Sequence, residues 1–239
     1  MTYNWLPTAP ELMARAEACA ICDELGARDE SMISQALGDY STRNVVLDYT
    51  DRLAVIPSVG PLVPGHSLMV TRFHVPNLLA SLHDQLIIEV ETLLKRFLHN
   101  AWVPARVVFC FEHATLDECQ PKRICTTTHA HLHLVPLTET QAREATSLAS
   151  GTQALISQAP GPCDASYPTE YVALFTARRE LRSPVIVLDA SDLPSQYLRQ
   201  KVSIVLGLPV WDWRELSNRQ LLMEAQARAP FSNINLLTV

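Results

Sequence analysis

Three histidines in residues 128–136 are spaced so that they could act together. The segment reads Thr-His-Ala-His-Leu-His-Leu-Val-Pro, and His129, His131 and His133 recur with a period of two. Successive side chains of a β-strand point to opposite faces, so a strand here presents three imidazoles on one face and apolar side chains on the other. Each buried imidazole needs a hydrogen-bond partner or a metal, which an ordinary core strand does not supply. The pattern therefore predicts a functional strand in preference to a structural histidine cluster.

Such a strand is suited to phosphorus chemistry. A neutral imidazole can attack phosphorus, carry the phosphoryl group as a phosphoramidate and then release it. The middle histidine, His131, suits the nucleophile's role because its neighbours can orient its other nitrogen and fix its tautomer. Thr126 and Thr128 share the histidine face if the strand begins early, and their hydroxyls could bind phosphoryl oxygens. Water or a phosphate-bearing acceptor could then take the group, so a hydrolase and a transferase both stay open.

A close pair of cysteines, Cys19 and Cys22, is the second group that could do chemistry. Six cysteines in 239 residues do not make a secreted disulfide scaffold, and in a reducing cytosol a Cys-x-x-Cys pair is metal-binding or redox-active. A structural zinc takes four sulfur or nitrogen ligands, of which this pair supplies two. Two histidines would have to complete the set.

Charge and hydropathy limit the class of protein. A formal net charge of −6 argues against a nonspecific nucleic-acid binder, which needs a basic surface. We therefore expect a small phosphorylated substrate that is bound locally. No run of eighteen apolar residues exists, and the first residues lack a signal-peptide pattern. The expectation is a cytoplasmic protein with neither nucleic acid nor membrane as a partner.

The elements that must position these residues form an α+β pattern. Strands are predicted at 44–47, 52–57, 66–72 and 107–111, with a short helix at 8–18 before the cysteine pair. Ser81 and Asp84 cap a helix that runs to about His99, and its apolar residues recur at helical spacing, so one face must pack on the sheet. We expect an antiparallel sheet with one long packed helix. Glu112 and His113 follow the fourth strand and should lie at the sheet end nearest the histidines.

The chain beyond residue 138 has a pattern of its own. We expect a catalytic domain at 1–138, a connecting segment at 139–165 and an α+β extension at 166–239 packed on the catalytic domain. The extension is predicted to hold a hairpin of strands 171–175 and 185–188, then helices from about 195 to 206 and from 212 to before 230. Trp211 and Trp213 flank the capping Asp212 and are interpreted as a packing anchor. Arg199 or Arg214 is expected to reach a bound phosphate, which a guanidinium suits.

Several motifs together resemble the histidine triad (HIT) superfamily, in particular its zinc-containing bacterial type. The resemblance rests on His-x-His-x-His followed by two apolar residues, on Pro64-Gly65-His66-Ser67-Leu68-Met69-Val70, on Arg72-Phe73-His74 and on Cys19-Ala20-Ile21-Cys22. It covers roughly residues 15 to 138. The resemblance implies a nucleotide phosphohydrolase or nucleotidyltransferase with a covalent phosphohistidine on His131, supported by His133 and His66. It also implies a structural zinc bound by Cys19, Cys22, His74 and His129, and it allows a homodimer.

The chain departs from the family pattern at several positions. Hint-type members have Gly-Gln-Ser before the first histidine, where this chain has Ile-Cys-Thr126 and so lacks the glutamine amide. Glu112 and His113 replace part of an Asn-Glu-Gly motif; they are interpreted as substrate contacts, with a strand-end salt bridge as the alternative. Ser58 stands where the family has its ribose-binding aspartate. A non-catalytic nucleotide or phosphometabolite sensor, or a biosynthetic enzyme with a non-nucleotide substrate, therefore remains an alternative function.

Overall fold

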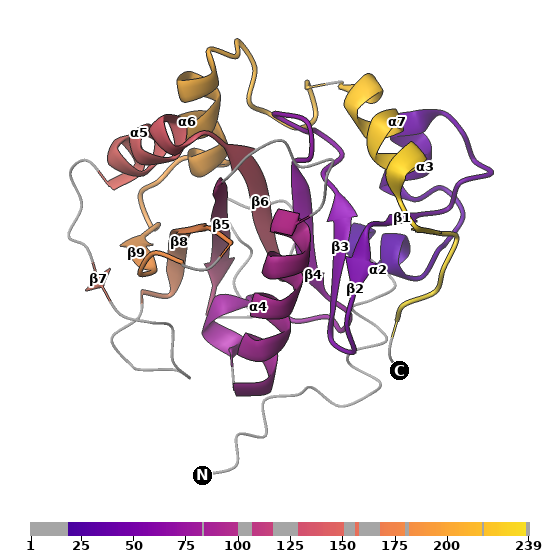
Figure 1. Cartoon of the computed structure of the whole chain (residues 1–239), viewed down its shortest axis with the longest axis horizontal. Helices are drawn as coiled ribbons and strands as arrows, with labels where there is room; N and C mark the ends of the chain where they lie inside the picture. Colours follow the sequence, from indigo (N-terminus) through magenta and orange to yellow (C-terminus); the bar gives the residue numbers. More distant parts are fainter. Residues whose placement is uncertain are drawn as a thin grey trace.

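The fold is α+β, as expected, and is built around an antiparallel sheet (Figure 1). The computed structural model describes residues 19–82, 84–99, 107–116, 129–150, 156–157, 168–179, 182–216 and 218–237. Within these ranges the main sheet has eight strands in the order β2 (Asp48–Tyr49), β3 (Leu53–Pro57), β4 (Ser67–Thr71), β6 (His131–Leu137), β5 (Val107–Thr115), β8 (Glu170–Ala177), β9 (Ile186–Asp189) and β7 (Ile156–Ser157). The helix expected at 8–18 lies outside the described residues.

One face of the sheet is covered by α4 (Asp84–His99), which crosses in front of the strands in Figure 1. The helix predicted at this position is confirmed, and its apolar stripe packs against the apolar side chains on this face of the sheet. The stripe consists of Leu86, Val90, Leu93, Leu94, Phe97 and Leu98. Leu132 and Leu134 of β6 belong to the same cluster. The alternation predicted for the histidine strand therefore holds, because its apolar side chains face the helix.

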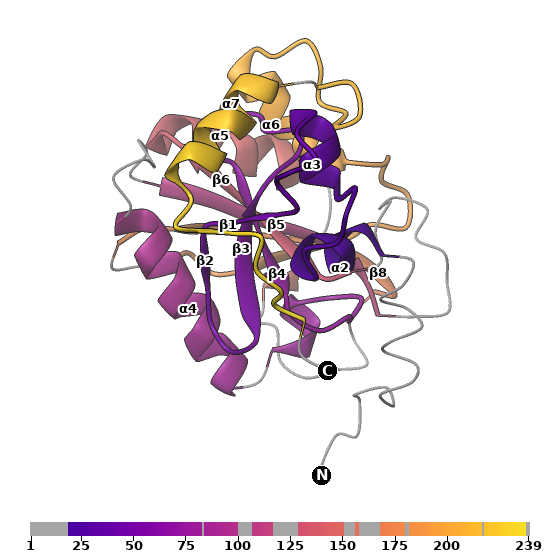
Figure 2. The same ribbon diagram turned by 90° about the vertical axis from the view of Figure 1, so that its right-hand side faces the viewer.

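The opposite face carries the histidines and is covered by other helices. The small residues of α5 (Glu139–Ser150) and the apolar side of α6 (Tyr197–Leu206) pack over β5, β6 and β8. At the far side of the sheet, α2 (Ala20–Leu25) packs over β3 and β4 through Ile21 and Leu25. Figure 2 shows α2 and α6 on different parts of this face. The triad strand lies between these two groups of helices.

The C-terminal residues continue the same sheet. β8 pairs with β5 from Val108 opposite Ala177 to Thr115 opposite Glu170, and β9 pairs with β8 as the predicted hairpin. Helix α6 ends at Gly207, which adopts the left-handed conformation expected of a stop (φ 65°).

The second C-terminal helix begins later than predicted. α7 spans Arg219–Arg228 and starts after Asn218, so the capping box expected at Asp212 and Glu215 is wrong. The Asp212 carboxylate instead accepts a hydrogen bond from the Arg214 amide at 3.0 Å and closes a turn. A capping motif specifies a local hydrogen bond, which a turn can satisfy as well as a helix.

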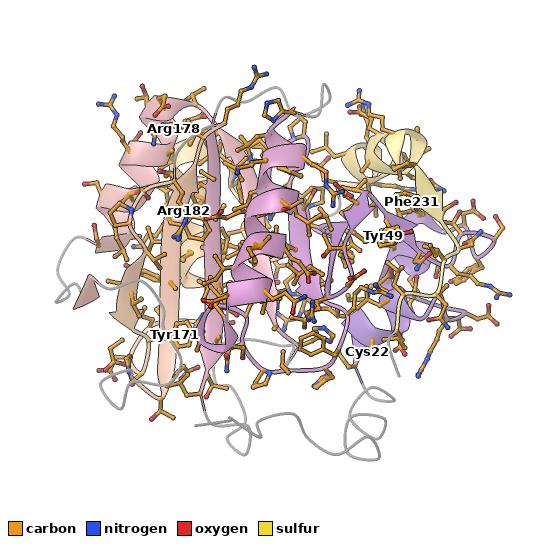
Figure 3. The ribbon with its side chains drawn as sticks, turned by 60° about the horizontal axis from the view of Figure 1, so that its bottom comes forward. Cys22, Tyr49, Tyr171, Arg178, Arg182 and Phe231 are labelled. Atoms are coloured by element: carbon orange, nitrogen blue, oxygen red, sulfur yellow. The ribbon has the colours of Figure 1, made fainter. Side chains whose placement is uncertain are left out.

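Two short helices lie between Cys19 and β1 (Val45–Val46), where no element was predicted. They are α2 and α3 (Met32–Leu37), the latter with Ser31 as its N-cap and Gly38 in the left-handed conformation after it. Helices of one to two turns gain most of their stability from packing, and Ile33 and Leu37 are buried against the sheet cluster. The last described strand, β10 (Phe231–Ser232), returns to pair with β1 (Val45–Val46). Tyr49 and Phe231 meet edge to face there at 5.1 Å (Figure 3).

Candidate active site and metal centre

A cavity of about 230 Å³ opens over the histidine face of β6. The pairing of the strands brings its floor together, since Leu68 of β4 and Phe111 of β5 both lie opposite His133. Helix α6 and the loop after it form another wall. The residues that line the cavity include His131, His133, His113, Ser58, Gly60, Gln196, Arg199, Trp213 and Arg214.

The hydrogen bond of His131 fixes the tautomer of its ring. Nδ1 of His131 lies 2.8 Å from the backbone carbonyl oxygen of His129. A carbonyl oxygen only accepts, so Nδ1 carries the proton. Nε2 is then left with its lone pair, which is the form of imidazole that can act as a nucleophile. The cavity that His131 lines is where that nucleophile would meet a substrate.

A second relay fixes the ring of His133. The Leu62 amide donates to Nδ1 of His66 at 3.1 Å, so His66 carries its proton on Nε2. That proton is donated to Nδ1 of His133 across 3.0 Å, which places the His133 proton on Nε2. Phe111 stacks on His133 with the ring centres 4.4 Å apart and the planes 14° from parallel. His133 is thereby held as a neutral ring with a donor on its second nitrogen.

Burial and neighbouring charges keep both supporting rings neutral. Burial lowers the pKa of His66 well below its ordinary value, and the positive charge of Arg199 lowers it further. Burial is also the main cause of the lowered pKa of His133, with smaller contributions from His131, His66, Arg199 and His113. A charged imidazolium is therefore disfavoured at this end of the cavity.

The first histidine of the run, His129, belongs to a separate cluster that can hold a metal ion. Ligand atoms of Cys19, Cys22, His74 and His129 all lie within 4.8 Å of one another, and all four residues are buried. Nδ1 of His129 is 3.3 Å from the Cys22 sulfur, and Nδ1 of His74 is 3.5 Å from it. Figure 3 marks Cys22 beneath the strands. The set expected from the resemblance is thus assembled from the start of α2, the segment between β4 and α4, and the residues just before β6.

The chemistry of the four side chains fits a metal. Nε2 of His129 donates to the Thr71 carbonyl oxygen at 2.7 Å, so its Nδ1 lone pair points at the sulfurs, as a ligand requires. The two cysteines share a hydrogen bond in which Cys22 keeps its proton. This bond lowers the pKa of Cys19 and raises the pKa of Cys22. A thiolate is already favoured here. Two sulfurs and two imidazole nitrogens are a donor set that zinc takes in structural sites.

Both predicted arginines line the cavity, in different states. Arg199 is only 3% exposed; its Nε donates to the Trp211 carbonyl at 3.0 Å and its Nη2 to the Gly60 carbonyl at 2.8 Å. Burial lowers its pKa to about 10, partly opposed by the charge of Asp212. Arg214 is exposed, lies over the Trp213 ring at 5.2 Å and pairs with Asp212 at 3.3 Å.

Of the other predicted substrate contacts, His113 lines the cavity and Glu112 does not. Glu112 is 1% exposed and does not line the cavity; its carboxylate accepts hydrogen bonds from the Leu78 and Leu79 amides at 2.5 and 2.9 Å. It anchors the short helix η1 (Leu79–Ser81), which argues against a substrate contact. His113 does line the cavity and lies 3.7 Å from Glu170. Thr126 and Thr128 lie outside the described residues.

Some cavity residues were not foreseen from the sequence. Gly60, Gln196 and Trp213 lie outside the strands and helices, where the spacing of residues does not predict which face a side chain occupies. Ser58 is buried at the cavity wall. The described residues that line the cavity include no aspartate or glutamate.

Comparison with known proteins gives little. No protein-family model matches the chain, and no curated protein matches it. Among solved structures the chain is similar to a Hit-like protein involved in cell-cycle regulation from Bartonella henselae, with 18% identity and a TM-score of 0.29, over 44% of this chain and 74% of that one. Among the described helices, none is long and apolar enough to cross a membrane.

Proposed function

We propose that the protein is an enzyme of the HIT type that transfers a phosphoryl or nucleotidyl group through a covalent intermediate on His131. The observation that carries the proposal is the 2.8 Å hydrogen bond from Nδ1 of His131 to the His129 carbonyl, which puts the ring proton on Nδ1 and makes Nε2 the nitrogen that carries the nucleophilic lone pair. A cavity over the same strand, lined by His131, His133 and two arginines, offers room for an anionic substrate. The activity is a nucleotide phosphohydrolase or nucleotidyltransferase.

The residues divide the reaction among them. Nε2 of His131 forms a bond to phosphorus while the bond to the leaving group breaks, and the electron pair of that bond goes with the leaving group. His133 holds a proton on Nε2 that can be donated to a phosphoryl oxygen or to the departing atom. Attack by water or by another phosphate then breaks the nitrogen–phosphorus bond and returns the lone pair to His131.

The metal in this proposal is zinc with a structural role. Cys19, Cys22, His74 and His129 would hold it. A closed site of this kind adds binding free energy to folding and takes no part in the bond changes. It would fix the residue whose carbonyl oxygen orients His131, and so hold the nucleophile in place from behind.

One observation favours a substrate other than an ordinary nucleotide. Proteins commonly bind ribose hydroxyls with a carboxylate, and the described residues that line the cavity offer none. Ser58 is at the wall instead. A biosynthetic enzyme of the same mechanism with a non-nucleotide phosphate substrate is therefore the second candidate.

Trapping the intermediate tests the proposal. The protein would be incubated with a panel of nucleoside phosphoramidates, dinucleoside polyphosphates and nucleotide sugars, and its intact mass measured for a covalent adduct. We expect an adduct that maps to His131 and is absent in His131→Ala. The matched control is His99→Ala, because His99 is exposed on α4 and bonds only its own helix through the Lys95 carbonyl. Full turnover in His131→Ala on any substrate found would refute the proposal.

A further inference from the structure

Arg199 is a buried positive charge without an ion-pair partner in the described part of the chain. It comes from α6, and both of its hydrogen bonds go to neutral backbone carbonyls, those of Gly60 and Trp211. The nearby acid, Asp212, forms its ion pair with Arg214 instead. Burial of an uncompensated charge costs several kcal/mol, so such groups are normally paired or bind a ligand.

Structural support alone does not explain the choice of arginine. A guanidinium has five N–H donors, and these two carbonyls use two of them. No described residue accepts from the second terminal nitrogen, Nη1. Arg72 shows what a purely structural arginine does in this fold: it donates to the carbonyls of Leu236, Thr50 and Asp51 and lies outside the cavity.

Arg199 is connected through hydrogen bonds to the loop that holds His66 and His133. The Gly60 carbonyl that it binds belongs to the loop whose Leu62 amide holds His66, and His66 in turn holds His133. Its charge is one cause of the lowered pKa of both rings. Arg199 therefore lies near the His66–His133 relay, and it lines the same cavity as His131 and His133.

We propose that Arg199, with Arg214 at the rim, forms an anion subsite for the leaving group and so selects substrates whose leaving group carries its own phosphate. This assignment rests on the proposed function for its catalytic consequence, but the binding of an anion does not. In the reaction, the His131–phosphorus bond forms, the bridging phosphorus–oxygen bond breaks, and its electron pair stays on the leaving phosphate. That phosphate needs no proton at neutral pH, and the guanidinium compensates its charge.

Calorimetry with inorganic pyrophosphate tests the subsite directly. We expect pyrophosphate to bind the wild-type protein and to bind Arg199→Gln roughly ten- to hundredfold more weakly, the effect of a lost charged hydrogen bond. Arg199→Lys keeps the positive charge but lacks the paired N–H donors of a guanidinium, so its loss of pyrophosphate affinity should be smaller than that of Arg199→Gln. Arg72→Gln is the matched control, because it removes a backbone-binding guanidinium away from the cavity, and its affinity should stay within about twofold of wild type. Thermal melting would establish that each variant is folded.

The leaving-group preference is tested by the rate of adduct formation. With adenosine diphosphate the leaving group is a phosphate, whereas with adenosine 5′-phosphoramidate it is ammonia. Arg199→Gln should slow adduct formation from the diphosphate at least about tenfold and leave the phosphoramidate within about twofold. A variant that is merely misfolded would slow both alike. Should neither compound label His131, adenosine nucleotides are not substrates, and the pyrophosphate titration still decides the subsite independently of the proposed function. Absent pyrophosphate binding by the wild type, equal binding by Arg199→Gln, or equal slowing with both compounds would overturn the assignment.

Discussion

A single residue connects the candidate metal centre with the candidate nucleophile. The side chain of His129 points into the Cys19–Cys22 cluster, and its backbone carbonyl accepts the proton of His131. The ring of His129 is itself held by the Thr71 carbonyl. Each ring in the run therefore has an assigned proton, and the directions of these hydrogen bonds, more than the presence of three histidines, define what each one can do.

The relay of His66 and His133 should make the protein less stable in acid. In the folded protein the pKa of each ring is well below the ordinary 6.5, because burial disfavours the charged form. The unfolded chain has the ordinary pKa and therefore binds these protons first, so the free energy of unfolding should fall as pH drops through about 6.5. Each proton adds a slope of about 1.4 kcal/mol per pH unit.

Urea unfolding between about pH 7.5 and pH 5 measures this slope. The wild type should show a steeper loss of stability than His66→Gln, which has one fewer titrating ring. Other histidines and the carboxylates contribute to both proteins, so the difference between the two slopes is the quantity of interest. Identical slopes would mean that His66 titrates alike in the folded and unfolded states.

The sequence predicted which histidines share a face but not how each ring is protonated. A period of two fixes the direction of a side chain on a strand, and this placed His131 and His133 together on the face opposite α4. The partner of each nitrogen comes from other segments, such as Leu62 or Thr71, which spacing cannot locate. Glu112 shows the same limit: its position suggested a substrate contact, whereas its carboxylate accepts hydrogen bonds from the Leu78 and Leu79 amides.

At the scale of elements, the metal cluster joins α2 to β6, and its loss should loosen both. Cys22→Ser removes one of two sulfurs from a buried set of four ligand atoms. We expect lower metal content by mass spectrometry of the native protein and a lower melting temperature, since metal binding contributes to folding. Strong chelators should destabilise the wild type in the same way.

A different cysteine supplies the control for this experiment. Cys110→Ala changes a thiol that is buried in the α4 cluster, away from the four ligands. It should lower stability through lost packing while leaving the metal content unchanged. If Cys22→Ser and wild type contain equally little metal and melt together, the cysteines are buried thiols and nothing more.

The loop at Gly60 and the segment at Trp213 pack too closely for any side chain at position 60. A Cβ added to Gly60 would lie 2.7 Å from both the Cα and the Cβ of Trp213, and backbone cannot move aside cheaply. Gly60→Ala should therefore cost about 1–3 kcal/mol of unfolding free energy, as overpacking does. It should also weaken any ligand that touches both loops.

Gly207→Ala is the comparison for that substitution. Gly207 has a positive φ of 65° but nothing within 4 Å of an added Cβ, so its replacement costs only backbone strain of about 1 kcal/mol. Urea unfolding of the two variants separates the effects. A Gly60→Ala protein as stable as wild type would show that the two loops can separate without loss.

Strong periodicity made the long elements predictable, and its absence explains the errors. The stripe of α4 and the alternation of β6 each repeat over several turns or residues, so packing and pattern agree. α2 and α3 have six residues each, too few for a period to stand out, and they are held by what they pack against. The helix predicted from Asp212 was wrong because a capping residue indicates a local hydrogen bond, which a turn can form without a helix after it.

On the scale of the whole molecule, residues 166–239 should be indispensable for solubility. β8 lies beside β5 along eight paired residues and buries Tyr171, Val172, Ala173 and Leu174. Truncation after about Gly161 would leave β5 as an apolar edge strand, which invites aggregation. We expect an insoluble product, judged by size-exclusion chromatography with light scattering. A monodisperse and active truncated protein would show instead that the C-terminal region is an independent accessory.

The pairing of β1 with β10 also has a consequence for synthesis. Asn44 donates to the carbonyls of Glu24 and Ile234, the second of which lies 190 positions further along the chain. A ribosome adds on the order of 5–20 residues per second, so β10 and Ile234 are synthesised roughly ten to forty seconds after β1 and the helices beside it. Throughout that interval the nascent Cys19 and Cys22 lack their permanent cover of Leu236. Native yield should therefore depend on translation speed and on how well the nascent thiols are protected from oxidants.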